Sequence, residues 1–177
     1  MKIKRLEFPE SSVLYPGREQ FNYSDSFGGT FYDLENKIGI EDIVHGFAKP
    51  LPGWIDCMMS VRDKIVWLFG LKTSEKERRR NLQYNYRFVE GEKMGFFNFY
   101  SRTDNEVILG EDDKHLNFRV SLLLETLNPD TGKKRAIITT TVTYNNWIGP
   151  VYFFIVRPFH RMIVPMMLKK DYSHLKD

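Results

Sequence analysis

The spacing of apolar residues changes along this chain, and the change limits the folds that it can adopt. Between residues 40 and 70, apolar residues recur every three or four positions, as they do on one face of a helix. Between residues 95 and 145 they alternate with polar residues, as in strands that bury one face. Helical spacing returns after residue 147. The sequence therefore predicts an α+β protein with an antiparallel sheet and a long C-terminal helix.

Turn residues delimit the strands of this sheet. A first strand is expected at residues 25–33, where the Gly28-Gly29 pair suggests a bulge or bend. Four more are expected at residues 95–100, 106–109, 115–126 and 135–145. The residues at 128–132, Asn-Pro-Asp-Thr-Gly, have the backbone preferences of a turn. The last two strands are therefore expected to form a long hairpin, and the sheet is at least partly a meander.

Three helices are expected beside the strands. The first has Ile40, Val44 and Phe47 on one face and stops before the prolines at 50 and 52. The second keeps one face apolar from residue 54 to residue 69 and ends at Gly70. The third follows Asn145-Asn146, which can cap a helix, and Pro158 is expected to kink it.

Length and composition favour one domain. The chain has 177 residues, of which 42% are hydrophobic, enough for a sheet and helices to enclose a core. We expect an N-terminal extension at residues 1–22, the domain at residues 23–170 and a C-terminal tail at residues 171–177.

Charge and cysteine content favour a cytoplasmic protein that does not bind nucleic acid. The formal net charge is only +3, a weak field for attracting a polyanion. The single cysteine, Cys57, has no partner for an internal disulfide, as expected in a reducing compartment. The first ten residues carry basic side chains but no apolar run behind them, so a secretory signal is not expected.

Residues 147–168 are apolar over about the length of a bilayer crossing. Arg157 and Arg161 lie at the centre of this stretch, where each would cost roughly 2.5–3.5 kcal/mol on insertion scales. The prolines at 150, 158 and 165 would further interrupt the backbone hydrogen bonds. We therefore expect a helix packed on the core and no membrane insertion.

Polar residues alternate along the strand expected at 115–126. His115, Asn117 and Arg119 share one face with Ser121. This face either contacts solvent or supplies a polar handle inside a cavity. The neighbouring Asp112, Asp113 and His115 resemble a partial metal site. Two acids after a glycine also suit a tight turn, and no second histidine or cysteine lies at ligand spacing, so no metal is expected.

Motifs that would name a reaction are absent from the sequence. There is no Gly-x-Ser-x-Gly nucleophile motif, no phosphate loop and no Gly-x-Gly-x-x-Gly dinucleotide motif, so no cofactor is expected. His160 lies between Arg157 and Arg161, and a general-base role for it is an open hypothesis. Whether the chain is an enzyme stays undecided at this point.

The predicted order of elements is a strand, two helices, an antiparallel sheet and a long terminal helix. This is the order found in the helix-grip architecture of the START-like and Bet v 1-like proteins, also called SRPBCC proteins. The comparison is one of element order, which implies a fold and not a function.

Several segments in combination resemble the domain-of-unknown-function family 2867. The resemblance runs from about residue 23 to residue 168. It is carried by Tyr23-Ser24-Asp25-Ser26-Phe27, by Trp54 with Arg62 and Phe69-Gly70-Leu71-Lys72, by Asp112-Asp113-Lys114-His115-Leu116-Asn117-Phe118-Arg119, and by Pro158-Phe159-His160-Arg161. Members are bacterial, have no assigned activity, and are sometimes joined to short-chain-dehydrogenase-like domains, which implies an accessory role beside redox enzymes.

The chain departs from the family pattern at two places. Family members often have His-Asn and Gly-Arg where this chain has Asn145-Asn146 and Gly149-Pro150. Chemistry that depended on that histidine or arginine would be missing here, which argues against a shared catalytic mechanism.

We therefore expect a module that binds a small hydrophobic molecule in a cavity between the sheet and the C-terminal helix. The candidate binding residues are Arg119, His115, Asn117, His160, Arg62, Trp54 and Asn145. One alternative is a START-like cyclase or isomerase that uses a histidine or arginine in the cavity. Another is an interaction protein that docks on a redox enzyme or on a second copy of itself, as a homodimer.

Overall fold

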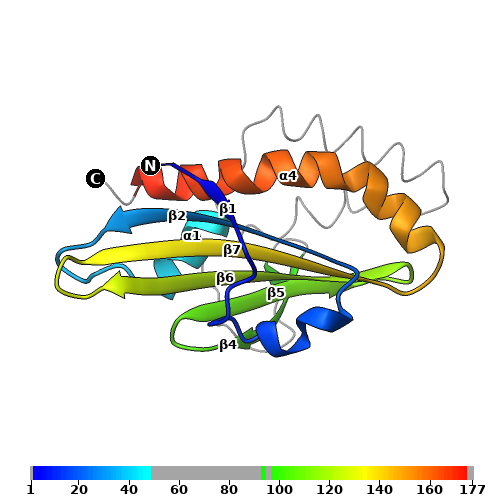
Figure 1. Cartoon of the computed structure of the whole chain (residues 1–177), viewed down its shortest axis with the longest axis horizontal. Coiled ribbons are helices and arrows are strands. Elements are labelled where there is room, and N and C mark those ends of the chain that lie inside the picture. The colour runs from blue at the N-terminus through cyan, green and yellow to red at the C-terminus, as the bar shows by residue number, and fades with distance from the viewer. Residues whose placement is uncertain (1, 49–92, 95–96, 175–177) are drawn as a thin grey trace.

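The computed structural model describes residues 2–48, 93–94 and 97–174. The predicted helix at residues 54–69, with the candidate residues Trp54 and Arg62, lies outside the described residues. The described part contains a sheet, the two helices α1 and α4, and a short 3₁₀ helix (Figure 1).

The sheet has seven strands in the order β1-β2-β7-β6-β5-β4-β3, and every neighbouring pair is antiparallel. The strands are β1 (Lys4–Leu6), β2 (Tyr23–Tyr32), β3 (Lys93–Met94), β4 (Phe97–Arg102), β5 (Glu106–Asp112), β6 (Leu116–Asn128) and β7 (Lys133–Tyr144). β3 to β7 follow one another as a meander, and β2 pairs with β7. The long hairpin predicted around residues 128–132 is confirmed as β6 and β7.

Two details of the strands differ from the prediction, namely the bulge offered as one alternative at Gly28-Gly29 and the end of β5. The Gly28-Gly29 pair makes no bulge, because β2 and β7 pair without a register shift. Gly28 instead makes room for the edge strand, since a Cβ atom there would lie 2.5 Å from Leu6 Cδ1. The second difference is that β5 continues past Gly110 to Asp112, so the turn begins at Asp113.

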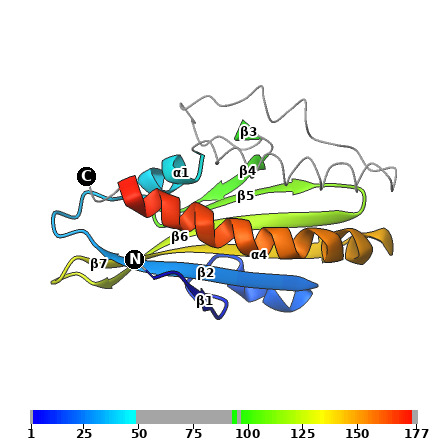
Figure 2. The ribbon, with the colours of Figure 1, turned by 90° about the horizontal axis from the view of Figure 1, so that it is seen from above.

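One face of the sheet carries the apolar core. α1 (Ile40–Ala48) and α4 (Ile148–His174) lie against this face (Figure 2). The larger of two buried apolar clusters joins both helices to the strands. Its members include Ile43, Val44, Phe47, Phe27, Leu109, Leu122, Ile138, Val164 and Leu168. The α+β fold predicted from the sequence is confirmed, with an antiparallel sheet under a long C-terminal helix, consistent with a helix-grip arrangement.

α4 starts where the sequence indicated. Asn146 Oδ1 accepts a hydrogen bond of 3.0 Å from the backbone N–H of Ile148, which caps the helix. Pro158 and Pro165 lie inside the helix, and its first turns run at an angle to the rest (Figure 1). A bend at Pro158 is expected, because proline removes one backbone hydrogen bond and crowds the preceding turn.

The opposite face of the sheet is covered by the N-terminal residues. β1 forms the edge strand, and the 3₁₀ helix η1 (Tyr15–Gln20) follows it along the chain (Figure 1). Between them, Ser12 donates to Glu106 Oε1 at 2.6 Å and the Val13 N–H donates to Glu106 Oε2 at 2.7 Å. The residues expected to form a separate extension, 1–22, thus contribute a strand and a cover to the fold.

Candidate functional site

A group of polar side chains lies between β2 and α4, close to the two apolar clusters. The smaller apolar cluster contains Leu116, Val142 and Phe153 with Tyr23 and Tyr144 packed against it. The larger one includes Val164 and Leu168 near the other end of the helix. We call the group between β2 and α4 the β2–α4 polar cluster. It consists of Tyr23, Asp25, Arg157, His160 and Arg161.

Asp25 is the centre of the cluster. Its side chain is 0% exposed, and each carboxylate oxygen has a partner. The Tyr23 hydroxyl donates to Oδ2 at 2.5 Å, and His160 Nε2 lies 3.0 Å from Oδ1. A buried carboxylate needs such partners, because leaving it without hydrogen bonds would cost several kcal/mol.

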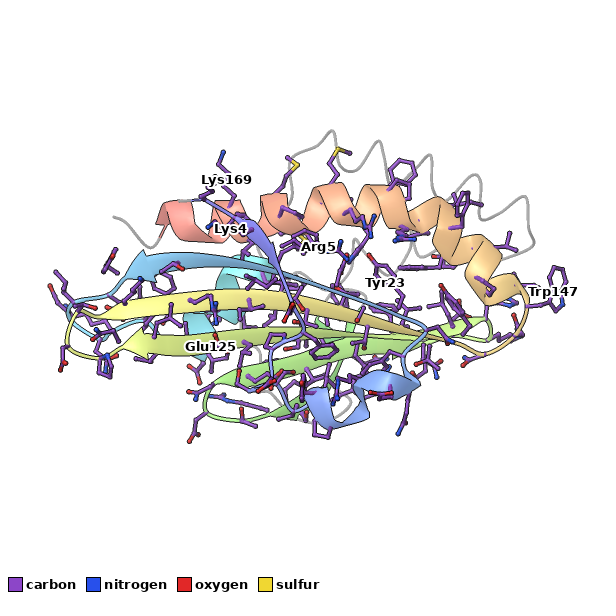
Figure 3. All side chains as sticks on the ribbon, viewed as in Figure 1. Lys4, Arg5, Tyr23, Glu125, Trp147 and Lys169 are labelled. Atoms are coloured by element: carbon purple, nitrogen blue, oxygen red, sulfur yellow. The ribbon has the colours of Figure 1, made fainter. Side chains whose placement is uncertain are left out.

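Cations from α4 surround the ring of Tyr23. Arg161 Nε donates to the Tyr23 hydroxyl at 3.3 Å, and the guanidinium carbon of Arg157 lies 5.0 Å from the ring centroid. The pKa of Tyr23 is raised above 10.0, mainly because the phenol is buried and next because it donates to Asp25, while Arg161 acts in the opposite direction. The phenol is therefore held protonated as a hydrogen-bond donor. Figure 3 shows Tyr23 lying under α4.

Simple spacing rules bring these residues together. Tyr23 and Asp25 are two positions apart on a strand, so their side chains leave the same face of the sheet. Arg157, His160 and Arg161 follow the i, i+3, i+4 spacing, so they lie close together on the surface of α4. Ser24, between Tyr23 and Asp25, leaves the opposite face of β2. Pro158, which follows Arg157, lies on a different side of α4.

Two polar atoms at this interface are buried without a hydrogen-bond partner within the described chain. They are Thr140 Oγ1 and Arg157 Nε. Thr140 pairs in register with Asp25, and its neighbour on β6 is Val120 of the larger apolar cluster, so it faces α4 as Asp25 does. Burying a polar atom without a partner costs about 1–3 kcal/mol, so each such atom needs an explanation.

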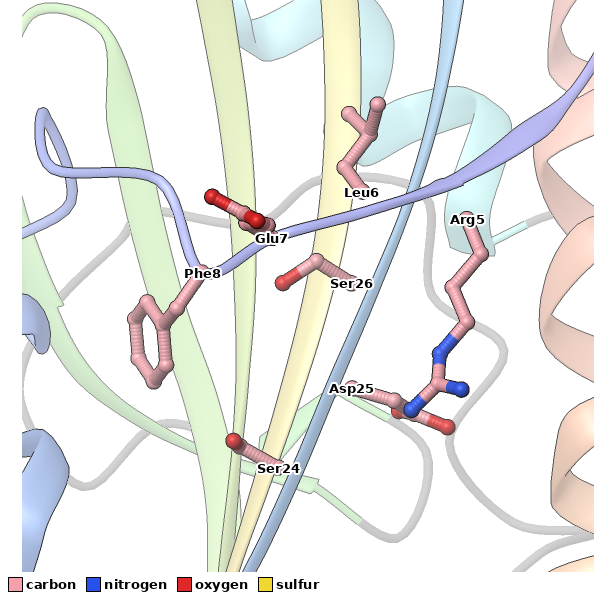
Figure 4. A pocket seen from close by; sticks show the side chains of 7 residues that line it. All are labelled: Arg5, Leu6, Glu7, Phe8, Ser24, Asp25 and Ser26. Atoms are coloured by element: carbon pink, nitrogen blue, oxygen red, sulfur yellow. The ribbon is translucent and has the colours of Figure 1, made fainter.

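A pocket of about 480 Å³ opens between β1 and β2 beside Asp25. It is lined by Arg5, Leu6, Glu7 and Phe8 on one side and by Ser24, Asp25 and Ser26 on the other. Figure 4 shows the Arg5 side chain extending toward Asp25. The pocket brings a further cation to the edge of the β2–α4 polar cluster.

Three of the candidate residues named from the sequence meet at the start of β6. The side-chain amide of Asn145 donates to Asn117 Oδ1 and to the backbone carbonyl of Asp113, both at 2.7 Å. The backbone N–H of Asn145 donates to the His115 carbonyl at 2.9 Å, and His115 Nδ1 lies 3.1 Å from the Asn146 side-chain nitrogen. These contacts join the β5–β6 turn to the start of α4.

Arg119 faces away from α4. The residues on either side of it, Phe118 and Val120, belong to or contact the core, so Arg119 points to the opposite face. There it donates to Asp112 Oδ1 at 2.7 Å and lies 3.7 Å above the Tyr100 ring. The hydrogen bond from Arg119 lowers the pKa of Asp112, while burial and a hydrogen bond to Asp112 raise that of Tyr100.

The structure therefore separates the candidates that the sequence treated as one set. Arg119 and Asn117 lie on the face covered by the N-terminal residues, whereas His160 lies on the α4 side. Gly110, the β5 partner of Arg119, leaves room for this side chain, because a Cβ atom there would lie 2.9 Å from Arg119 Cδ. Trp54 and Arg62 lie outside the described residues.

The sequence did not single out Tyr23 and Asp25 as site residues, nor did it assign Arg157 and Arg161 to one. Tyr23 and Asp25 entered only as carriers of a resemblance, and the two arginines entered as charges inside an apolar helix beside His160. A usable signal was present in the chain, because an acid inside an apolar strand and two arginines inside an apolar helix each require a buried partner. The acid and the arginines can be assigned to the same site only when β2 and α4 are known to be neighbours.

The comparisons with known proteins are consistent with this description but name no activity. No curated protein and no solved structure matches the chain significantly. The model of one protein family does match, over residues 19–167. This is most of the chain and includes every residue of the β2–α4 polar cluster. The chain therefore belongs to the family described as proteins of unknown function DUF2867.

Proposed function

We propose that this protein binds a small hydrophobic molecule that carries one polar or anionic group, held between the sheet and α4. The apolar part packs beside the smaller apolar cluster around Phe153 and Tyr144. The polar group accepts hydrogen bonds from Arg157 Nε and the Thr140 hydroxyl. Binding pockets of this kind combine an apolar wall with a few polar groups that fix orientation.

The two buried polar atoms without partners carry this proposal. The large majority of buried polar side-chain atoms in native proteins are hydrogen bonded. Of the three described exceptions, Thr141 Oγ1 lies on the outer face of the sheet, and the other two lie at one helix–sheet interface. A ligand oxygen that accepts from them would recover the free energy lost by burying them. The Arg157 guanidinium also rests on the Tyr23 ring, which holds it in place.

The charges of the cluster favour an anionic group on the ligand. Asp25 is the one acid of the cluster, and both of its oxygens are engaged by Tyr23 and His160. Within the described residues, Arg157 has no acidic partner within ion-pair distance. A carboxylate on the ligand would supply that partner with a charge-assisted hydrogen bond.

Native mass spectrometry tests the proposal. The mass of the purified protein under native conditions is compared with its mass after denaturation. We expect the native mass to be larger by a copurified species of roughly a few hundred daltons. Arg157→Met should lose this species, because methionine keeps the apolar stem but cannot donate. Arg18→Met is the control, since Arg18 contacts Glu19 and the Tyr15 ring on the far side of the sheet, away from α4. Equal occupancy in both variants would contradict the proposal.

The Asp25–His160 pair favours a second candidate function, that of an enzyme using His160 as an acid or base. A histidine whose Nε2 is held by a buried carboxylate presents its other nitrogen in a defined orientation. If the protein is an enzyme, the recovered molecule should change mass during incubation with fresh protein. His160→Gln should then stop the conversion and leave the affinity intact, whereas a binding module would return the molecule unchanged.

A further inference from the structure

The outward side of α4 carries a row of exposed apolar side chains, which we call the α4 stripe. It consists of Trp147, Val151, Phe154, Met162 and Met166. Trp147 and Phe154 are 79% and 77% exposed. Trp147 immediately precedes α4. At about 100° per residue, the spacing of the other four positions keeps them within roughly one third of the helix circumference. Pro158, also exposed, falls within the same arc and closes the gap between Phe154 and Met162.

The opposite side of α4 is committed to the protein core. Phe153, Val164 and Leu168 are buried in the two apolar clusters. By length and composition, residues 148–169 could cross a membrane, although one helix of this kind is weak evidence. A helix fixed to a sheet along one side cannot be surrounded by lipid. On α4, the side that carries the stripe is the one available to an apolar environment, and a long contiguous stripe of this kind marks an interaction surface.

The charged residues within the segment that carries the stripe are all basic. The sequence from Trp147 to Lys169 contains no Asp or Glu. Arg161 and Lys169 are exposed beside the stripe and at its end. Figures 1 and 2 place the start of β1 beside the C-terminal half of α4, and Figure 3 shows Lys4 and Lys169 there. Lys4 and Arg5 are exposed as well.

We propose that the α4 stripe docks on the surface of an anionic lipid bilayer, with α4 parallel to the membrane plane. Interfacial helices combine exposed aromatic and aliphatic residues with flanking cations, and they bury their apolar face by roughly 5–10 Å. Trp147 suits the headgroup level, where tryptophan is enriched. Arg161 and Lys169 would face the anionic headgroups, with each cation near the surface adding to binding.

The charge pattern favours lipid over a second copy of this chain. In a symmetric dimer through the α4 stripe, Arg161 and Lys169 of one copy would approach the same cationic surface on the other. No acidic residue between 147 and 169 could compensate, and like charges across an interface cost several kcal/mol. An anionic bilayer supplies the missing negative charge and an apolar layer together.

Sedimentation with vesicles tests this inference. The full chain is mixed with vesicles of phosphatidylcholine alone, or of phosphatidylcholine with phosphatidylglycerol. We expect binding to the anionic vesicles that weakens with added salt. Phe154→Ser should reduce the partition coefficient between vesicles and water roughly tenfold or more. The reason is that Phe154, exposed in the free protein, would bury its ring in the bilayer. Leu34→Ser is the matched control, since Leu34 is 82% exposed on the loop before α1, and it should bind as the parent does.

A charge reversal separates the electrostatic part. Lys169→Glu should weaken binding to anionic vesicles by roughly tenfold and leave binding to neutral vesicles unchanged. Arg18→Glu, on the far side of the sheet, should change neither. Three results would overturn the inference: no binding by the folded protein, a large loss of thermal stability in Phe154→Ser, or a dimer that Phe154→Ser dissociates. A loss of thermal stability would show that another part of the same chain covers the stripe. A dimer that Phe154→Ser dissociates would show that a second copy of the chain covers it.

Discussion

Asp25 and His160 are 135 positions apart in the chain, and their side chains meet at 3.0 Å between β2 and α4. The other oxygen of Asp25 is held by Tyr23, which in turn accepts a hydrogen bond from Arg161. These contacts join β2 to the adjacent residues His160 and Arg161 of α4. They therefore fix the rotation of α4 about its own axis relative to the sheet. That rotation directs Arg157 toward Tyr23 and the α4 stripe toward the outside.

Replacing Tyr23 by phenylalanine should show how much this network contributes to stability. We expect Tyr23→Phe to lower the free energy of unfolding by about 1–3 kcal/mol, because Asp25 loses a buried donor. Urea denaturation at neutral pH measures the change. Tyr32→Phe is the control, because Tyr32 is exposed at the end of β2 and should stay within about 0.5 kcal/mol of the parent.

The pH dependence gives the Tyr23 prediction a second readout. Folding raises the pKa of Tyr23 above 10.0, so the folded state favours the protonated phenol. The stability that this supplies is complete below pH 10.0 and is lost as the pH rises through the folded value. The parent should therefore lose stability above pH 10.0 faster than Tyr23→Phe does. Parallel curves for the two proteins would contradict the assigned environment of Tyr23.

The Lys134–Asp33 pair should be the most sensitive ion pair of the described residues. Both side chains are nearly buried, with Nζ of Lys134 2.7 Å from Asp33 Oδ2. Lys134→Met should lower the free energy of unfolding by about 3–5 kcal/mol, since it leaves a buried carboxylate without its counter-charge. Lys37→Met, which removes an exposed pair with Glu35, should cost less than about 1 kcal/mol. Urea denaturation of both variants makes the comparison.

Acid should weaken the same pair. Burial alone would raise the pKa of Asp33, but the hydrogen bonds from Lys134 and from the backbone of Ile38 and Lys37 outweigh it, so the pKa is lowered below 3.8. The stability supplied by this carboxylate is present above pH 3.8 and is lost as the pH falls through the folded value. Lys134→Met should therefore lose less stability over that acid range than the parent. If Lys134→Met instead lost more stability than the parent over this acid range, the loss could not be assigned to the Asp33 carboxylate.

Glu106 should hold the N-terminal cover on the sheet. It is 1% exposed, and Ser12, the Val13 N–H and Ser121 all donate to it. In Glu106→Gln, one oxygen becomes an NH₂ group that cannot accept from Val13 or the two hydroxyls. We expect a loss of about 1–3 kcal/mol and faster hydrogen exchange at the Val13 amide. Ser11→Ala removes only an exposed bond to Glu125, and the Val13 amide should then exchange as in the parent.

Periodicity predicted the fold well and the site poorly, for one physical reason. Alternation in β6 and β7 and the helical spacing of Ile40, Val44 and Phe47 are local, and they reflect which face of each element is buried. Whether a polar residue on that face meets a partner depends on which elements are neighbours. For Asp25 the neighbours that decide this are β2 and α4, which are more than a hundred residues apart in the chain.

The outer face of the sheet illustrates the same limit. The polar face of the strand at 115–126, which includes Ser121, was expected either to meet solvent or to line a cavity. Ser121 is instead buried, and beside it Ser26 and Thr139 are buried and bond each other at 2.9 Å. The segment that contains Ser12 and Val13 covers this outer face. The alternation of β6 does not predict that cover, and the covering segment itself has no periodic pattern of apolar residues that would indicate it.

Thr139 and Thr140 are adjacent on β7 and offer a comparison that tests the proposed binding site. Both are buried, but Thr139 has a partner in Ser26, whereas Thr140 Oγ1 has none in the described structure. Thr139→Val should cost about 1–3 kcal/mol, because the Ser26 hydroxyl loses its bond. Thr140→Val replaces a hydroxyl without a partner by a methyl of similar size, so the ligand-free protein should be unchanged or more stable by about 1–2 kcal/mol. If the Thr140 hydroxyl holds the ligand, the same variant should carry less of the copurified species. Occupancy measured by native mass spectrometry, together with urea denaturation, separates the two effects, and full occupancy in Thr140→Val would place the ligand elsewhere.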